Sequence, residues 1–403
     1  MKILHTSDWH LGRTLYSRKD RQEEHSLFLD WLLKTIKEQA VDVLLIVGDV
    51  FDTSTPGISS QKMYYDFLIN VRNSGCRHVI VVGGNHDSPS FLNAPKVVLA
   101  ALDVVVVGNA TENIENEILV LNDEHGASAL IVCAVPFLRE RDISRFAEGM
   151  SYSDRSVKIN ESIRKHYQEI AELAEKKRQE LQADIPIVAT GHLSVMGGKR
   201  SDDDGVRDTY IGNIAGVGND IFPTVFDYVA LGHYHIPSVI KEHIRYCGSP
   251  IPMGFGEVGQ EKKVFIGEFG SEPTITPVDV PLFQRLESIR GDKQQIESRL
   301  NELKKLDESV WTEVVYDGRD IFPDFSTWVN ELVENTKIEV LRLQNKPHLE
   351  QLLTTEDHAE SLDTLNETEV FEKLLGKNDF TEESKTMLRG LYQQILNEIN
   401  DIN

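Results

Sequence analysis

Five short motifs in the first part of the chain carry side chains that can bind metal ions. They are Asp8-Trp9-His10, Gly48-Asp49-Val50-Phe51-Asp52, Gly84-Asn85-His86-Asp87, Gly191-His192 and Gly232-His233-Tyr234-His235. The set offers carboxylates, imidazoles and an amide oxygen, and it includes no thiolate. These donors suit manganese, iron or zinc, and a mixture rich in carboxylates favours Mn²⁺.

Hydrolysis of a phosphoester is the chemistry that such donors support. A carboxylate can bridge two cations, and Asp49 is the candidate for this position. Two cations about 4 Å apart acidify a shared water and neutralise charge on a phosphoryl group. The motifs therefore predict a two-metal phosphoesterase.

Each motif taken alone has a simpler interpretation. Asp8 and His10 could be a helix cap and a surface histidine, and His192 could be a buried histidine at a turn. The Gly84–Asp87 motif is more informative, because it has three polar side chains directly after an apolar run, where packing does not need them. The agreement in order and context indicates one shared site.

Each motif directly follows an apolar run with the composition of a buried strand. These runs include residues 43–47, 79–82, 185–190 and 228–231. Helical spacing of apolar residues separates the first two runs, which predicts alternating strands and helices. Since open α/β sheets bind ligands at the carboxyl ends of their strands, the five motifs can meet in one site.

A cluster of prolines between residues 271 and 281 indicates a domain boundary. We predict a first, catalytic domain over residues 1–275. A small α+β domain should follow over residues 281–345, with the order strand, helix, strand, helix, strand. We expect a linker over residues 346–365 and a helical segment over residues 366–403.

The C-terminal segment carries an apolar stripe at helical spacing. Its members are Leu388, Leu391, Tyr392, Ile395, Ile399 and Ile402. Such a stripe either packs on its own domain or binds a partner, because a helix in a groove uses the same spacing. The sequence leaves both interpretations open.

The composition is that of a globular protein with more than one domain: 403 residues, 40% hydrophobic and 27% charged. The N-terminus turns polar within five residues and lacks the apolar run of a signal peptide or membrane span. We therefore expect a cytoplasmic protein without a membrane partner. The three cysteines lie far apart, which predicts buried, reduced thiols.

The net charge of −23 bears on nucleic acid binding, since a protein that binds a polyanion should present a basic face. Residues 350–403 contain 13 acidic and 4 basic residues, so nine of these charges belong to the C-terminal segment. Carboxylates that bind divalent ions also become electropositive sites. The charge therefore does not exclude a DNA substrate.

Together the motifs resemble those of the calcineurin-like metallophosphoesterase superfamily. Within it, three stretches are similar to the SbcD family of bacterial nuclease subunits: Ile3-Leu4-His5-Thr6-Ser7-Asp8-Trp9-His10-Leu11-Gly12, Gly48-Asp49-Val50-Phe51-Asp52-Thr53 and Arg245-Tyr246-Cys247-Gly248-Ser249-Pro250-Ile251-Pro252. The resemblance is specific over residues 1–255 and rests on pattern beyond them. It implies a two-sheet β-sandwich core flanked by helices, a capping domain over residues 281–345 and a C-terminal helical hairpin.

The resemblance also implies a role for each donor. One metal ion would be held by Asp8, His10, Asp49 and His235, and a second by Asp49, Asn85, His192 and His233. His86 would bind no metal; it would contact the scissile phosphate and protonate or stabilise the leaving oxygen. Asp87 would be the carboxylate that orients His86.

The implied activity is that of a Mn²⁺-dependent nuclease in DNA repair, recombination and replication. It would combine 3′ to 5′ exonuclease activity on double-stranded DNA with endonuclease cleavage near hairpins or blocked ends. The implied partners are an SbcC-type ATPase, gripped by the C-terminal helices, and a second copy of the chain. The homodimer would form through the helices of residues 58–103, within a heterotetramer.

Two other functions compete with this one. The first is a metallophosphoesterase that acts on a small phosphodiester or a phosphoprotein, and the second is a scaffold with a vestigial site. The chain beyond residue 281 argues against the first, because a small-molecule enzyme has little use for a cap and a helical hairpin. The complete donor set and His86 argue against the second.

Deletion of residues 360–403 tests the partner interpretation of the C-terminal stripe. Because every metal-binding motif lies elsewhere, the truncated protein should still hydrolyse a simple phosphodiester when metal is present. It should no longer bind the ATPase, which co-elution on a sizing column measures. Equal affinity of the full-length and truncated chains for the ATPase would contradict the interpretation.

Overall fold

The structure is a computed structural model of the 403-residue chain. It describes residues 1–144, 151–199, 216–269, 273–318 and 322–346, with eight further positions between Glu372 and Tyr392. The chain forms two compact units, Met1–Pro347 and His348–Asn403. The predicted linker and C-terminal helical segment lie almost entirely outside the described residues, and they stay predictions.

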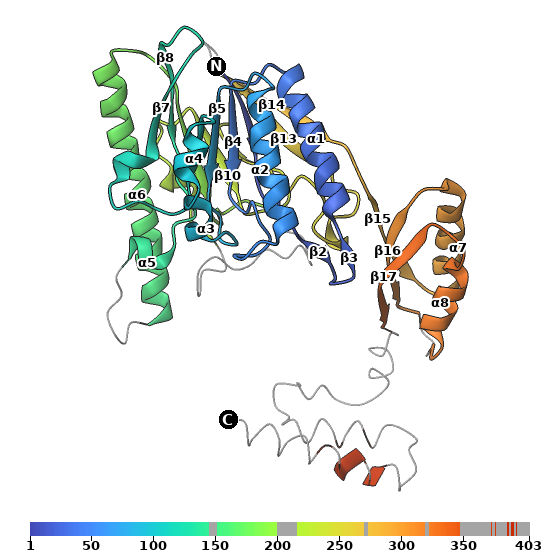
Figure 1. Ribbon diagram of the computed structural model, residues 1–403. Helices are drawn as coiled ribbons and strands as arrows, with labels where there is room; N and C mark the ends of the chain where they lie inside the picture. Colours follow the sequence, from blue (N-terminus) through green and yellow to red (C-terminus); the bar gives the residue numbers. More distant parts are fainter. Residues whose placement is uncertain are drawn as a thin grey trace. The chain divides into compact units, whose positions relative to one another are not determined.

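Two six-stranded sheets form the centre of the first unit (Figure 1). The first sheet has the order β14 (Thr274–Val280), β13 (Lys262–Glu268), β1 (Lys2–Thr6), β4 (Val43–Val47), β5 (His78–Val82) and β6 (Val104–Val107). The second has the order β11 (Ser238–Lys241), β12 (Ile244–Tyr246), β10 (Tyr228–Gly232), β9 (Ile187–His192), β8 (Ser128–Cys133) and β7 (Ile118–Asn122). Strands β1, β4, β5 and β6 are parallel, as are β8, β9, β10 and β12, which confirms the α/β prediction.

The two sheets pack face to face as a sandwich. On β4, Val43, Leu45 and Val47 are fully buried in one apolar cluster with Val188 of β9 and Ala230 of β10. Successive side chains on a strand point to opposite faces, so the intervening residues of β4 join the cluster under the helices. This double burial explains why the strands are continuous apolar runs in the sequence.

Helices cover the outer faces of both sheets. The first sheet is covered by α1 (Gln22–Glu38) and α2 (Ile58–Arg72), with the short α3 (Pro89–Asn93) and α4 (Lys96–Ala100) near β6. The second sheet is covered by α6 (Tyr152–Leu181), which contacts α5 (Glu140–Ile143). Short 3-10 turns occur at η1 (Ile114–Glu117), η2 (Asn219–Ile221), η3 (Phe255–Glu257) and η4 (Lys304–Leu306). No helix in the described residues is both long and apolar enough to cross a membrane.

A third sheet lies beyond the proline cluster. It consists of β15 (Arg285–Gly291), β16 (Val310–Tyr316) and β17 (Ile338–Asn345), joined by α7 (Lys293–Leu303) and α8 (Phe325–Val333). The elements have the predicted order, but the α+β class is corrected. All three strands are parallel, since each connection is a helical crossover, and the unit is therefore a βαβαβ arrangement.

The third sheet packs against two segments of the first unit that connect strands of the sandwich. One is the hairpin of β2 (Thr14–Leu15) and β3 (Lys19–Asp20), and the other is η3. Five side chains form an apolar cluster between them, which we call the joint cluster: Leu15, Phe255, Leu286, Trp311 and Leu341. At its edge the Lys19 ammonium lies 2.7 Å from the Glu339 carboxylate.

Trp9, between the two candidate metal ligands of the first motif, is a core residue. Its side chain is fully buried and meets the rings of Phe28 and Phe67 edge to face, at 5.8 and 5.2 Å between centroids. Its indole N–H donates to the Thr6 hydroxyl at 2.9 Å. The ring anchors the loop after β1 on α1 and α2.

Replacement of this ring should destabilise the metal-free protein. We expect Trp9→Ala to lower the free energy of unfolding by about 3–5 kcal/mol, the usual effect of removing a buried aromatic side chain. Urea unfolding followed by far-UV circular dichroism measures the loss. The matched control is Leu27→Ala on α1, where the side chain is 43% exposed and the change should stay within about 0.5 kcal/mol. A loss below about 1 kcal/mol for Trp9→Ala would contradict the anchoring role.

Candidate metal centre

The loops after five strands converge at one edge of the sandwich. Asp8 and His10 follow β1, Asp49 follows β4, and Asn85 and His86 follow β5 of the first sheet. From the second sheet, His192 ends β9, while His233 and His235 follow β10. Every motif singled out in the sequence therefore contributes to the same region.

The backbone in these loops is strained. Asp8, His10, Asp49 and His233 have positive φ angles of 54°, 47°, 49° and 104°. Such angles are uncommon for residues with a side chain, and they gather where the surrounding structure fixes them for a functional reason. Hydrogen bonds from the Asp8 and His10 N–H groups to the carbonyls of Gly48 and Asp49, both 3.0 Å, tie two of the loops together.

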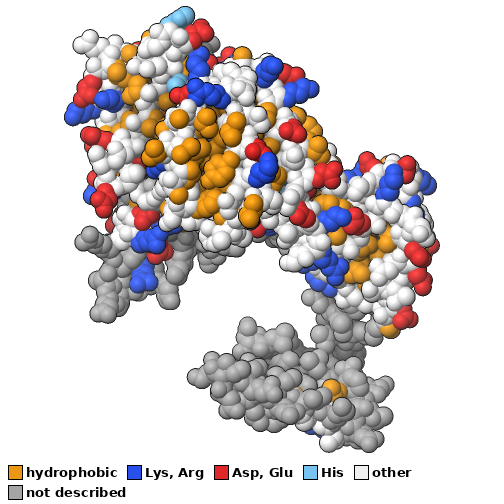
Figure 2. All heavy atoms as spheres, in the orientation of Figure 1, with side chains coloured by type: hydrophobic (Ala, Val, Ile, Leu, Met, Phe, Trp, Pro, Cys, Tyr) orange, Lys and Arg blue, Asp and Glu red, His pale blue; other side chains and the backbone are white. Residues whose placement is uncertain are grey.

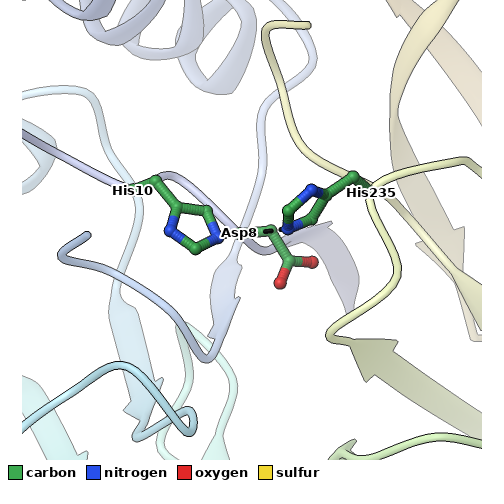
Figure 3. A group of neighbouring side chains, drawn as sticks. All are labelled: Asp8, His10 and His235. Atoms are coloured by element: carbon green, nitrogen blue, oxygen red, sulfur yellow. Dashed lines mark hydrogen bonds between the residues drawn. The ribbon is translucent and has the colours of Figure 1, made fainter. Parts of the chain in front are cut away.

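Asp8, His10 and His235 form the first group of donors (Figure 3). Their donor atoms lie within 4.8 Å of one another, and all three side chains are buried. The His10 and His235 Nε2 atoms face each other at 3.1 Å. Two neutral imidazoles can share at most one proton there, and a cation can use both lone pairs.

Asp49, His192 and His233 form the second group, again within 4.8 Å. The side-chain oxygen of Asn85 adds a fourth donor, 3.0 Å from His192 Nε2 and 3.1 Å from His233 Nδ1. Asp49 Oδ2 also lies near the first group, since it is 3.2 Å from His192 Nε2 and 3.7 Å from His10 Nε2. Its carboxylate is thus located where a bridge between two cations would be.

His86 lies beside both groups. Its ring meets that of His10 edge to face, with centroids 4.8 Å apart, and its backbone N–H donates to Asp49 Oδ1 at 2.9 Å. One of its nitrogens also lies within 4.8 Å of donor atoms of His10 and Asp49. Its Nδ1 donates to the backbone carbonyl of Asp52 at 2.9 Å, so Nε2 is the nitrogen left to act on a substrate.

Electrostatics keep His10 and Asp49 in forms that bind cations and favour a proton on His192. Burial lowers the pKa of His10 to about 3, so its imidazole is neutral at pH 7. Burial by itself would raise the pKa of Asp49, but the imidazoles of His192 and His10 hold it well below its usual range. For His192, burial lowers the pKa, and the Asp49 carboxylate outweighs this effect and raises it to about 9. A divalent cation held by Asp49 and His192 would supply positive charge in place of that proton.

Asp87 differs from the sequence expectation. We predicted that it orients the His86 ring, but its carboxylate accepts hydrogen bonds from the backbone N–H groups of Gly84, Phe51 and Val50, at 2.9, 3.0 and 3.2 Å. Asp87 therefore joins the loop after β5 to the loop after β4. The group that accepts a hydrogen bond from the His86 ring is the Asp52 carbonyl, because the Asp87 carboxylate is occupied by the three backbone N–H groups.

Asp52 is a residue to which the sequence assigned no role. Its Oδ1 lies 3.2 Å from His10 Nδ1 and accepts from the Arg13 guanidinium, also at 3.2 Å. His10 and Arg13 hold the pKa of this carboxyl below its usual range against the effect of burial. A carboxylate on the outer nitrogen orients the ring and raises the basicity of the inner nitrogen. The sign of this role in the sequence is the second aspartate of the Gly48–Asp52 motif.

Two glycines allow the loops to approach this closely. A Cβ on Gly48 would overlap the imidazole of His192, and one on Gly84 would overlap the carboxylate of Asp49. Gly48 also has a φ of +81°, which disfavours any side chain.

The donor set fits two divalent cations. It offers buried, converging imidazole nitrogens and carboxylate oxygens in two groups that share one carboxylate. Imidazole nitrogens suit ions such as zinc and iron, and carboxylate oxygens suit manganese, so the mixed set fits divalent transition-metal ions.

Comparison with known proteins gives matches over nearly the whole chain. The family model described as calcineurin-like phosphoesterase matches residues 1–237, and the model described as type 5 capsule protein repressor C-terminal domain matches residues 282–378. The SbcD subunit of the nuclease SbcCD from Escherichia coli (strain K12) is 34% identical over 405 residues, which cover 99% of this chain and 98% of that protein. The proteins of the same name from Rhodobacter capsulatus and Bacillus subtilis (strain 168) are each 32% identical, over 70% and 66% of both chains respectively.

Substitution of Gly48 tests the close approach of the loops. We expect Gly48→Ala to lose bound Mn²⁺ after dialysis, because its Cβ displaces the His192 ring, and metal per chain can be measured by mass spectrometry. Gly75→Ala is the matched control, since Gly75 has a φ of +93° and nothing within 4 Å of an added Cβ. It should lower the free energy of unfolding by about 1–2 kcal/mol through backbone strain alone and retain its metal. Equal metal content in both variants would contradict the crowding argument.

Proposed function

The chain belongs to the calcineurin-like phosphoesterase family, and within it to the SbcD family of nuclease subunits, and from this premise we propose that it is a Mn²⁺-dependent DNA nuclease. It combines 3′ to 5′ exonuclease activity on double-stranded DNA with endonuclease cleavage at hairpins and blocked ends. The observation that carries the hydrolytic part is the pair of donor groups that share the Asp49 carboxylate.

In this proposal seven residues hold two divalent ions. Asp8, His10, Asp49 and His235 hold one, and Asp49, Asn85, His192 and His233 hold the other. The grouping of the donor atoms within 4.8 Å and the two distances from Asp49 Oδ2 support the division. When bound, the ions supply an acidified water and neutralise charge on the phosphoryl group. The carboxylate-rich donor set supports Mn²⁺.

His86 acts on the substrate in this proposal and binds no metal. Its Nδ1 is occupied by the Asp52 carbonyl, which leaves Nε2 to donate a proton to the leaving oxygen as a general acid. The Asp49 contact to its backbone N–H keeps it beside the shared carboxylate. Asp87 supports it indirectly, through the backbone of the loop that carries it.

The choice of DNA rests on the relatives and on the chain beyond the phosphoesterase region. The relative from E. coli matches over nearly the full length of both chains, so the match includes the parts that a small-molecule phosphodiesterase or a phosphoprotein phosphatase does not need. We assign the catalytic domain to residues 1–275, the capping domain to residues 281–345, a linker to residues 346–365 and partner binding to residues 366–403.

The proposed partners are an SbcC-type ATPase and a second copy of the chain, in a heterotetramer that acts in DNA repair and recombination. The names of the relatives describe one subunit of an SbcCD nuclease, which supports the ATPase partner. An apolar surface on α2 and α4 supports the second copy of the chain as a partner. Its side chains Ile58, Val97 and Val98 are 85, 88 and 70% exposed. Figure 2 shows hydrophobic side chains gathered over this face.

A nuclease assay tests the proposal directly. The full-length chain with Mn²⁺ should shorten end-labelled duplex DNA from its 3′ ends and cut hairpin DNA near the loop. Without Mn²⁺ neither product should form. Hydrolysis of a small phosphodiester without any cleavage of DNA would favour the alternative substrate class.

Substitution of His86 tests its separation from the metal-binding residues. We expect His86→Ala to lower the rate of DNA cleavage by about 10²–10⁴-fold, the usual contribution of a general acid, while two Mn²⁺ ions per chain still bind. Gel assays and calorimetric titration measure the two effects. His125→Ala is the control, because His125 is exposed on the turn between β7 and β8. An unchanged cleavage rate in His86→Ala would refute the role.

A further inference from the structure

We propose that Glu257 is a positioning residue, whose carboxylate orients the His235 imidazole toward the metal centre while Lys262 holds that carboxylate in place. The inference rests on the proposed function, because it assigns a task at the same centre. It concerns a residue that lies outside all five motifs.

Glu257 is the last residue of η3, and its side chain is fully buried. Its Oε2 accepts hydrogen bonds from the Met253 N–H at 3.1 Å and from the Lys262 ammonium. Its Oε1 lies 3.6 Å from His235 Nδ1, and within the described part of the chain it accepts no hydrogen bond of ordinary length. At this distance the contact is electrostatic, with one carboxylate oxygen left to face the ring.

His235 uses its two nitrogens in opposite directions. Nε2 faces His10 across the first donor group at 3.1 Å, and Nδ1 faces Glu257. A carboxylate only accepts hydrogen bonds, so it favours the tautomer with the proton on Nδ1 and the lone pair on Nε2. This is the form of histidine that binds a cation, and a carboxylate behind such a ring is a common way to fix it.

His10, the other histidine of the same group, has the same arrangement. Its Nδ1 faces a carboxylate oxygen of Asp52 at 3.2 Å, while its Nε2 points inward. His192 of the second group instead has a backbone carbonyl, that of Val47, 3.0 Å from Nδ1. The first group is therefore the one in which both histidines are backed by carboxylates from elsewhere in the chain.

Lys262 joins the carboxylate to the backbone of the histidine. Its buried ammonium donates to the His235 carbonyl and to the Ser249 hydroxyl, both at 3.0 Å, as well as to Glu257. Removing two charges from water is costly, and a buried ion pair is often no more stable than an apolar pair of the same size. Fold stability alone therefore gives little reason for this pair beside a metal-binding residue.

Metal binding to the full-length Glu257→Gln variant tests the inference without reference to activity. The wild-type chain, stripped of metal and titrated with Mn²⁺ in a calorimeter, should bind two ions. In Glu257→Gln we expect one of the two to bind about 10–100-fold more weakly and the other to be unchanged, as for other carboxylates behind metal-binding histidines. Unchanged affinity at both sites would overturn the inference.

Glu117→Gln is the matched control. Glu117 is also fully buried and also contacts a histidine, with its Oε2 2.9 Å from His166 Nε2 on α6. This variant should lose fold stability and keep both Mn²⁺ affinities. An equal loss of Mn²⁺ affinity in the control would show that any buried carboxylate produces the effect, and it would overturn the specific role of Glu257.

The double variant Glu257→Gln with Lys262→Met separates positioning from charge balance. The single variant leaves the Lys262 ammonium without its carboxylate, and the double variant removes that charge too. We expect urea unfolding to show recovered stability while the weaker Mn²⁺ affinity persists. Recovery of affinity together with stability would overturn the inference, because the single variant would then act through the unpaired lysine. A wild-type chain that binds fewer than two ions would instead contradict the proposed function itself.

Discussion

The carboxylate of Asp49 is the point on which the metal centre depends. It is buried, and a buried carboxylate needs partners of opposite charge or good hydrogen bonds. His192 and His10 lie on either side of Oδ2, and the backbone N–H of His86 donates to Oδ1. One side chain thus contacts histidines of both donor groups and the backbone of His86. Because the histidines come from both sheets, the sandwich must form before the carboxylate has its partners.

The loops around this carboxylate are held together by backbone contacts that run between motifs as well as within them. Asp87 binds N–H groups of two loops, and the Asp8 carboxylate accepts from the His233 N–H at 2.9 Å. Glycines at positions 48 and 84 leave room where a Cβ would overlap a donor. The strained backbone of the loops is tolerated because the strands that precede them are buried on both faces and tightly packed. The packed strands fix where each loop begins. Rigid strands therefore support a strained and precisely arranged edge.

The third sheet contacts the same segments that support the first donor group. Leu15 of the joint cluster lies on the hairpin that follows His10, and Phe255 of the cluster lies on the turn that ends at Glu257. Tyr16 connects the two segments, with its ring stacked on Phe255 at 5.3 Å between centroids. The βαβαβ unit and the metal centre thus share their supporting elements, although they have separate apolar cores.

The sequence by itself determined the donor types, their order and the alternating strands and helices, because each depends on short stretches of chain. The motif that contains His86 could be singled out because packing does not need its polar residues after a buried run, and the resemblance to a known family implied the separate role of His86. Asp49 was the candidate bridge because a carboxylate can bind two cations. Tertiary structure alone decided the contacts of Asp87, the location of Asp52 behind His10 and that of Glu257 behind His235. It also decided that the small sheet is parallel. These features depend on which distant strands pair and in which direction. The composition of a short stretch of chain does not determine that pairing.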